Sequence, residues 1–123
     1  QNKSEENQYF KTLRSDRNKT REEALDVLEE LIGKTELTTE EKKSATDKAA
    51  ALAAAAEKEA AIETVLKAKG FKNVLVVIGE KDVNVIIDAA LDTAKTQQVR
   101  DAVMSKTDFT AADIKIIASN ENS

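Results

Sequence analysis

The side chains that could do chemistry in this chain are carboxylates, hydroxyls and lysines, and their spacing does not fit a catalytic site. Adjacent carboxylates occur at residues 22–23, 29–30 and 40–41, on predicted helix surfaces. Catalytic carboxylates need a cleft that separates their pKa values. Ser44 lies four residues before Lys48, whereas a Ser/Lys acyl enzyme uses a spacing of three. We therefore expect no enzymatic activity.

The residue types that are missing exclude further classes of function. The chain of 123 residues contains no His and no Cys, so it cannot build a Ser-His-Asp triad, a cysteine nucleophile, a Cys/His zinc site or a disulfide. Its three glycines are isolated, and none forms a phosphate-binding loop. Asp82 and Asn84 match the start of a calcium loop, but the required Gly and Glu are missing. We expect no catalytic, metal-binding or cofactor-binding residue, and no cofactor.

The composition is that of a small acidic domain with an aliphatic core. Lys and Arg number 19, Asp and Glu number 23, and the net charge is −4, while aromatic residues make up only 3%. The overall acidity argues against broad binding to nucleic acids or to anionic membranes, because phosphates bind to basic faces. The chain lacks an apolar stretch long enough to span a membrane. It begins at Gln1 rather than Met, so the question whether an N-terminal membrane anchor lies upstream stays open.

Three arginines form a stripe near the N-terminus. Arg14, Arg17 and Arg21 have i, i+3, i+7 spacing and share one helix face, and none has an acidic residue three or four positions away. An antiparallel pairing with the next helix places Arg14 opposite Glu57, and Arg17 and Arg21 opposite the alanines of residues 50–54. Two interpretations stay open: solvated arginines on a surface helix, or a stripe that meets acidic groups of a partner.

Hydrophobic spacing and capping signals predict the order α-α-β-β-α-β. The helices span residues 4–32, 38–69 and 94–106, and the strands span residues 74–78, 83–87 and 114–117. Thr38 and Glu41 have the spacing of a capping box. Gly70 follows the second helix, and Asp92 or Thr93 begins the third.

This order predicts an α+β fold with a three-stranded sheet that is covered on one face by helices. We divide the chain into a long, partly projecting N-terminal helix (1–33), a compact domain (34–119) and a frayed tail (120–123). The strand order cannot be inferred from the sequence. An unpaired edge strand invites strand addition by another protein, and residues 83–85 and 114–116 are both candidates for that edge.

Four sequence blocks in a fixed order make the chain similar to a known family. The blocks are Tyr9-Phe10 followed by Arg14, Arg17 and Arg21; residues 57–63 running into residues 67–71; Val83-Asn84-Val85; and Asp113-Ile114-Lys115-Ile116. In this order and spacing the chain resembles the stage III sporulation protein AH family of endospore-forming bacteria. The resemblance covers about residues 9–117. The chain departs from the family in lacking the membrane anchor and in its alanine-rich second helix.

The resemblance implies a fold, a location and a partner. The implied fold is a ring-building motif, similar to ring proteins of type III secretion and flagellar basal bodies. The implied location is the outer forespore (mother-cell) membrane, with a single-pass anchor and this domain in the intermembrane space. The implied partner is the forespore protein stage II sporulation protein Q, which has a LytM-like fold. Together the two form part of a channel between mother cell and forespore, and self-assembly into a homo-oligomeric ring is left open.

We expect the partner to contact the first helix and the strand edges. The residues that we place in this interface are Tyr9, Phe10, Arg14, Arg17, Arg21, Val83, Val85 and Lys115. The alternative is a nucleic-acid-binding domain similar to type II KH domains. Such domains clamp the nucleic-acid backbone with a Gly-x-x-Gly loop, which this chain lacks, so the first hypothesis predicts no nucleic-acid partner.

Overall fold

The computed structural model describes residues 7–119. The frayed tail that we predict at residues 120–123, and the helical start at residues 4–6, lie outside the described residues. The elements are α1 (Gln8–Ile32), α2 (Thr39–Ala68), β1 (Val74–Ile78), β2 (Val83–Ile87), α3 (Thr93–Lys106), the short 3₁₀ helix η1 (Ala111–Asp113) and β3 (Ile114–Ala118). The predicted order α-α-β-β-α-β is therefore confirmed.

Local capping sets where the first two helices begin and end. Asn7 has an extended backbone, and its side chain accepts a hydrogen bond from the Phe10 N–H at 3.0 Å, so it caps the start of α1. Thr38 and Glu41 form the predicted capping box at the start of α2. Gly70 follows the end of α2 with a φ of 107°, a conformation that glycine adopts without strain.

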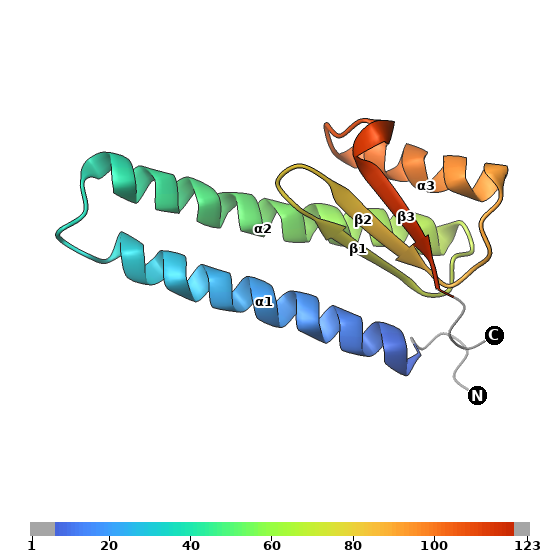
Figure 1. Cartoon of the computed structure of the whole chain (residues 1–123), viewed down its shortest axis with the longest axis horizontal. Helices are drawn as coiled ribbons and strands as arrows, with labels where there is room; N and C mark the ends of the chain where they lie inside the picture. Colours follow the sequence, from blue (N-terminus) through green and yellow to red (C-terminus); the bar gives the residue numbers. More distant parts are fainter. Residues whose placement is uncertain (1–6, 120–123) are drawn as a thin grey trace.

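The three strands form one mixed sheet with β2 in the centre. The strand order is β1-β2-β3; β2 pairs antiparallel with β1 and parallel with β3. One face of the sheet carries Val76, Val85 and Ile116, which stand in register, and packs against the apolar sides of α2 and α3. Figure 1 shows these two helices behind the sheet. The prediction of a sheet covered on one face is thus confirmed.

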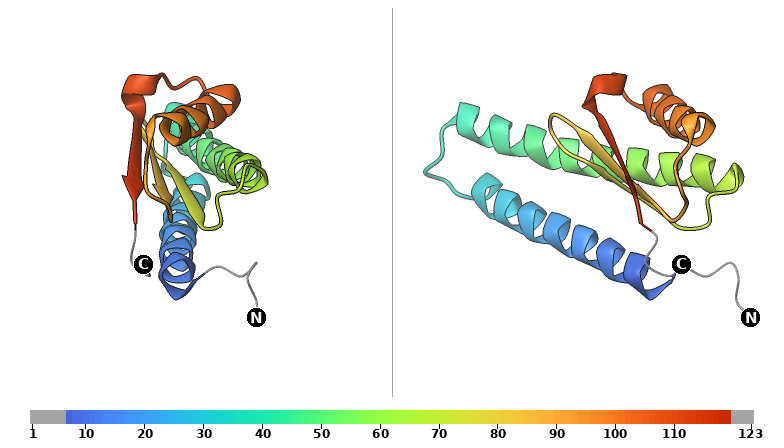
Figure 2. Two further views of the ribbon diagram at one scale, coloured as in Figure 1. Left: turned by 90° about the vertical axis from the view of Figure 1, so that its right-hand side faces the viewer. Right: turned by 45° about the vertical axis from the view of Figure 1, so that its right-hand side comes forward.

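The long helix α1 lies antiparallel beside α2 and next to the β1 edge of the sheet (Figures 1 and 2). The two helices extend together beyond the sheet as far as the turn that joins them, so α1 does not project alone. The predicted division at residue 33/34 falls in that turn, and it stays a prediction. This arrangement sets α1 and α2 against the side of β1 that faces away from β2.

Candidate partner interface

Two buried glutamates of α2 face the free side of β1. Glu59 is 0% exposed and Glu63 is 6% exposed. The backbone N–H of Val76 donates to Glu63 Oε2, and that of Ile78 donates to Glu59 Oε2, each at 2.9 Å. These carboxylates take the place of the carbonyl groups that a fourth strand would supply.

The arginine stripe supplies the matching donors to the same strand. Arg14 Nη2 donates to the Val74 carbonyl at 3.1 Å, and Arg17 Nη1 donates to the Val76 carbonyl at 2.7 Å. Side chains thereby satisfy four outward backbone groups of β1: the carbonyls of Val74 and Val76 and the N–H groups of Val76 and Ile78. A second strand cannot pair with β1 unless these contacts are broken.

The arginines and glutamates also pair with each other. Arg14 lies 2.8 Å from Glu63, Arg17 lies 2.9 Å from Glu63 and 3.3 Å from Glu59, and Arg21 lies 2.7 Å from Glu59. We call these five residues the ionic ladder. Removing one partner from a buried ion pair costs about 3–5 kcal/mol, because the other charge is left without compensation. The ladder therefore locks α1 and α2 onto β1.

The predicted pairing of Arg14 with Glu57, and of Arg17 and Arg21 with alanines, is wrong. Helical side chains point back toward the N-terminus of their own helix. In an antiparallel pair, the side chain of a residue therefore does not end beside the residue whose backbone lies opposite. It ends about one turn farther toward the N-terminus of its own helix. This shift brings Arg17 and Arg21 to Glu59 instead of the alanines. Because their guanidinium groups are engaged inside the chain, we no longer place the three arginines in the partner interface.

Three further predicted interface residues are interior. Phe10 is 1% exposed, and Val83 and Val85 are each 0% exposed. Val83 and Val85 belong to the central strand, which is paired on both sides, so residues 83–85 are not a free edge. Tyr9 is 39% exposed, and its ring meets the Phe10 ring edge-on at 5.5 Å. Of the predicted residues, Tyr9 and Lys115 remain accessible.

Strand β3 is the edge that stays open among residues 7–119. No described strand pairs with its outer side. The Ser119 N–H donates to the Ile87 carbonyl at 2.7 Å, so by alternation the backbone groups of Ile116 and Ala118 point away from β2. The N–H of Ile114 is taken by the Ala111 carbonyl. The open edge therefore offers the N–H groups of Ile116 and Ala118.

One apolar and one positively charged side chain, both exposed, flank this open edge. Ile117 is 48% exposed, on the sheet face opposite the main core. Lys115 has a side chain that is 70% exposed, with its Nζ 4.0 Å from Asp82 Oδ2. A lysine on an edge strand discourages indiscriminate pairing. An apolar side chain and a cation beside free backbone donors suit the addition of one specific strand.

The sequence matches the SpoIIIAH-like protein family over residues 1–116. The chain belongs to the SpoIIIAH-like family. The predicted family is thereby confirmed. None of the curated proteins matches the chain.

One solved structure shares the fold of this SpoIIIAH-like domain. It is described as "Structure of the SpoIIQ-SpoIIIAH pore forming complex", and one of its chains superimposes with a TM-score of 0.77 at 22% sequence identity. The match covers 92% of the present chain and 100% of that chain. The shared arrangement confirms the predicted α+β fold class.

The residues that sequence reasoning missed in this SpoIIIAH-like domain are Glu59 and Glu63. Both lie within a sequence block that carries the family resemblance, four residues apart and on one helix face. That spacing complements the arginine stripe, and it was the available signal for the ionic ladder. The composition of an alanine-rich helix does not indicate that two of its carboxylates are buried.

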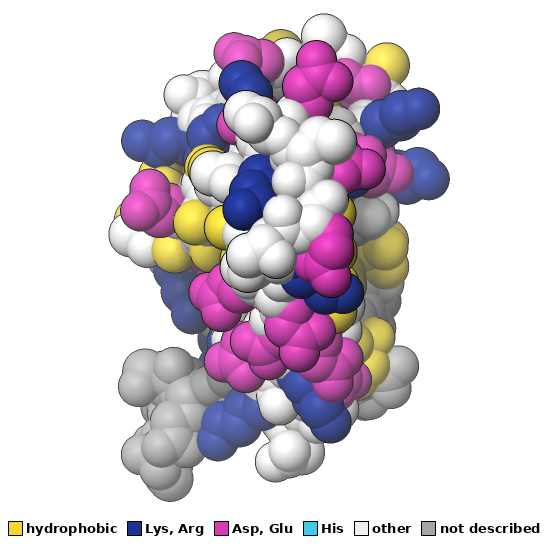
Figure 3. All heavy atoms as spheres, turned by 90° about the vertical axis from the view of Figure 1, so that its left-hand side faces the viewer, with side chains coloured by type: hydrophobic (Ala, Val, Ile, Leu, Met, Phe, Trp, Pro, Cys, Tyr) yellow, Lys and Arg dark blue, Asp and Glu magenta, His cyan; other side chains and the backbone are white. Residues whose placement is uncertain are grey.

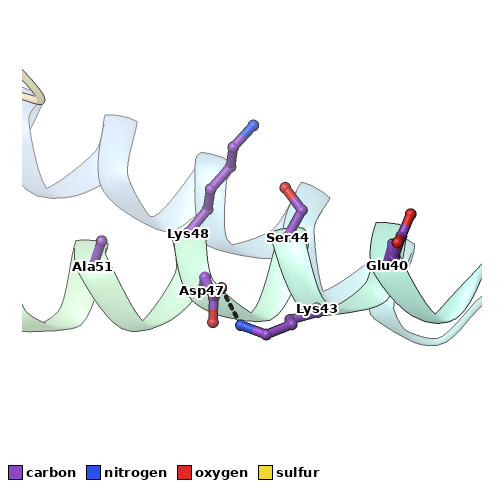
Figure 4. Close-up of a pocket in the computed structure, with 6 residues that line it drawn as sticks. All are labelled: Glu40, Lys43, Ser44, Asp47, Lys48 and Ala51. Atoms are coloured by element: carbon purple, nitrogen blue, oxygen red, sulfur yellow. Dashed lines mark hydrogen bonds and ion pairs between the residues drawn. The ribbon is translucent and has the colours of Figure 1, made fainter.

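The Ser44 and Lys48 pair of the SpoIIIAH-like domain sits on an open helix surface. Figure 4 shows both side chains on successive turns of α2, beside an ion pair of 2.9 Å between Lys43 and Asp47. The residues that line this hollow all come from α2, so no second element closes over them.

Residues 7–119 of the SpoIIIAH-like domain contain neither a group of metal ligands nor a membrane-spanning helix. No described group of His, Cys, Asp and Glu residues could hold a metal ion. None of the described helices combines the length and the apolar character that a membrane crossing requires.

Proposed function

We propose that this SpoIIIAH-like chain is a non-enzymatic structural part of a sporulation complex and that it works by binding a SpoIIQ-like protein. Family membership supports the sporulation role. The fold shared with a chain of a SpoIIQ-SpoIIIAH complex supports the choice of partner. The chain contains no His and no Cys, which excludes Ser-His-Asp triads, cysteine nucleophiles and Cys/His metal sites and supports a role through surface complementarity.

The open edge of β3 is the observation from which we infer the binding surface. The ionic ladder occupies the outer side of β1, and β2 is paired on both sides. Strand addition at β3 then needs no rearrangement of the described chain. Lys115 and Ile117 supply specificity beside the backbone hydrogen bonds, and we keep Lys115 in the interface.

The location and the higher assembly belong to the same proposal. A single-pass anchor upstream of Gln1 would hold this domain at the outer forespore membrane, facing the intermembrane space. There it would form part of a channel between mother cell and forespore, and copies would assemble into a ring. These statements are supported by the family resemblance.

The nucleic-acid alternative gains no support from the arginines. Their guanidinium groups, which would be the first candidates for phosphate contacts, are paired with Glu59 and Glu63. A KH-like role would therefore need another basic surface and another backbone clamp. We do not pursue it as a second function.

Sedimentation velocity tests the proposed partner. The chain, mixed at about 50 µM with the soluble domain of the SpoIIQ-like protein from the same organism, is expected to form a heavier species that neither protein forms alone. The chain by itself, at the same concentration, measures self-assembly separately. A mixture that sediments as the sum of its two components would contradict the proposed function.

A further inference from the structure

Charge is distributed unevenly along the long axis of the molecule. Residues 22–30 hold five acidic residues and no base, and all five are exposed. Across residues 22–41 there are eight acidic residues and one lysine. Figure 3, which looks onto the turn between α1 and α2, shows acidic side chains gathered at this end. We call residues 22–41 the acidic tip.

The opposite end of α2 is basic. Lys67, Lys69 and Lys72 are all exposed, and residues 64–72 contain no acid. We call these three lysines the basic end. A helix of the length of α2 spans about 45 Å, several times the Debye length of about 8 Å at physiological salt. The two ends therefore act as separate electrostatic surfaces, and the net charge of −4 conceals the basic one.

The neighbouring loop cancels only part of the positive charge. The backbone N–H of Asp88 donates to the Asn73 carbonyl, which brings residues 88–92 beside the basic end. The Asp88 carboxylate accepts a hydrogen bond from Asn73 at 2.8 Å. Asp92 caps α3 and lies 3.7 Å from Lys95. Leu91, in the same loop, is 38% exposed.

The basic end lies where the described chain begins and ends. Figures 1 and 2 place the start of α1, the end of β3 and the C-terminal end of α2 at one end of the molecule, with the acidic tip at the other. The Asn7 N–H donates to Asn73 Oδ1 at 3.1 Å, so the start of α1 lies beside the residue that follows Lys72.

We propose that the basic end rests on a membrane surface of anionic lipids and that the acidic tip points away from that membrane. The inference rests on the proposed upstream anchor, which would hold this end within reach of the headgroups. Each lysine close to an anionic surface strengthens binding roughly fivefold, so three lysines together contribute roughly a hundredfold. That is weak for a free domain and sufficient to orient a tethered one. The acidic tip is repelled by the same surface.

The experiment tethers the chain to vesicles and measures its orientation. The chain has no His and no Cys, so an N-terminal hexahistidine tag attaches it to nickel-chelating lipid and one introduced cysteine carries a dye. Ala90→Cys reports on the basic end and Thr35→Cys on the acidic tip; both positions are exposed. Energy transfer to acceptor lipids is compared between neutral vesicles and vesicles with about 30% phosphatidylglycerol, at about 50 mM salt.

On anionic vesicles we expect at least twofold more transfer from position 90 than on neutral vesicles, and no gain at position 35. The triple variant Lys67→Glu/Lys69→Glu/Lys72→Glu removes the difference, as does salt at about 0.5 M. The triple variant Lys42→Glu/Lys43→Glu/Lys48→Glu, with the same charge change at the other end of α2, retains it. Circular dichroism checks that both variants are folded.

Equal transfer on the two kinds of vesicle would overturn the proposal. Loss of the difference in both triple variants would overturn it too, because the effect would then follow net charge. The tag replaces the native anchor and no SpoIIQ-like protein is present. Failure here therefore leaves the sedimentation result untouched, and the two proposals fail separately.

Discussion

Replacing Arg17 and Arg21 together with Glu is expected to unfold the domain at room temperature. The change removes the ion pairs of Glu59 and places two further carboxylates beside Glu59 and Glu63. Removing a partner from a buried ion pair costs about 3–5 kcal/mol, so the loss exceeds about 5 kcal/mol and reaches the total stability of an ordinary small domain. Urea unfolding followed by circular dichroism at 222 nm measures the change.

The matched control changes two exposed lysines of the same helix. Lys11→Glu and Lys19→Glu together alter the net charge by the same amount, and both positions are exposed. Surface substitutions away from special features usually change stability by less than about 0.5 kcal/mol each. If the arginine pair behaved like the lysine pair in urea, the ionic ladder would not hold α1 and α2 to β1.

Replacing Ala118 with Pro is expected to weaken binding of the SpoIIQ-like partner at least about a hundredfold. Ala118 is exposed, and its N–H points away from β2, so proline removes a donor from the open edge without removing a bond of the sheet. The proline ring also occupies the space through which an added strand would approach. Isothermal titration calorimetry with the soluble partner domain measures the dissociation constant.

Ala118→Val is the control for this change, because valine keeps the N–H and favours extended backbone. It is expected to bind within about threefold of the parent chain. Thermal melts of both variants show whether the sheet is intact. A proline variant that melts like the parent and binds the partner unchanged would remove β3 from the interface.

Local signals were enough to predict the elements. The runs Val74–Ile78 and Val83–Ile87 match the strands residue for residue, since two runs rich in β-branched residues on either side of a turn favour a hairpin. Thr38 with Glu41 fixed the start of α2, and Gly70 marked its end. Each of these predictions depends on contacts within a few residues, which the sequence contains directly.

The ionic ladder depends on contacts between distant residues, and sequence spacing did not predict it. Arg17 and Glu63 are 46 residues apart, and their meeting depends on how far each side chain leans along its own helix. Phe10 illustrates the same limit, because its burial follows from where α1 lies against the rest of the fold. The sequence showed that the arginines lacked partners in their own helix, but not that α2 supplies them.

The identity of the open edge was also beyond the sequence. Residues 83–85 and 114–116 have the same alternating aliphatic pattern, and strand order decides which of them is central. The antiparallel pairing with β1 and the crossover through α3 place residues 83–85 in the middle. Of the two candidate edges, residues 114–116 are thus the ones that remain available.

Amide hydrogen exchange on the complex, followed by NMR, tests most directly the claim that the chain binds its partner through the β3 edge. If an added strand takes the N–H groups of Ile116 and Ala118, these two amides are expected to exchange at least about a hundredfold more slowly in the complex than in the free chain. The amides of Val76 and Ile78, already bonded to Glu63 and Glu59, should change little. A stable complex in which the amides of Ile116 and Ala118 exchange as fast as in the free chain would contradict binding through the β3 edge.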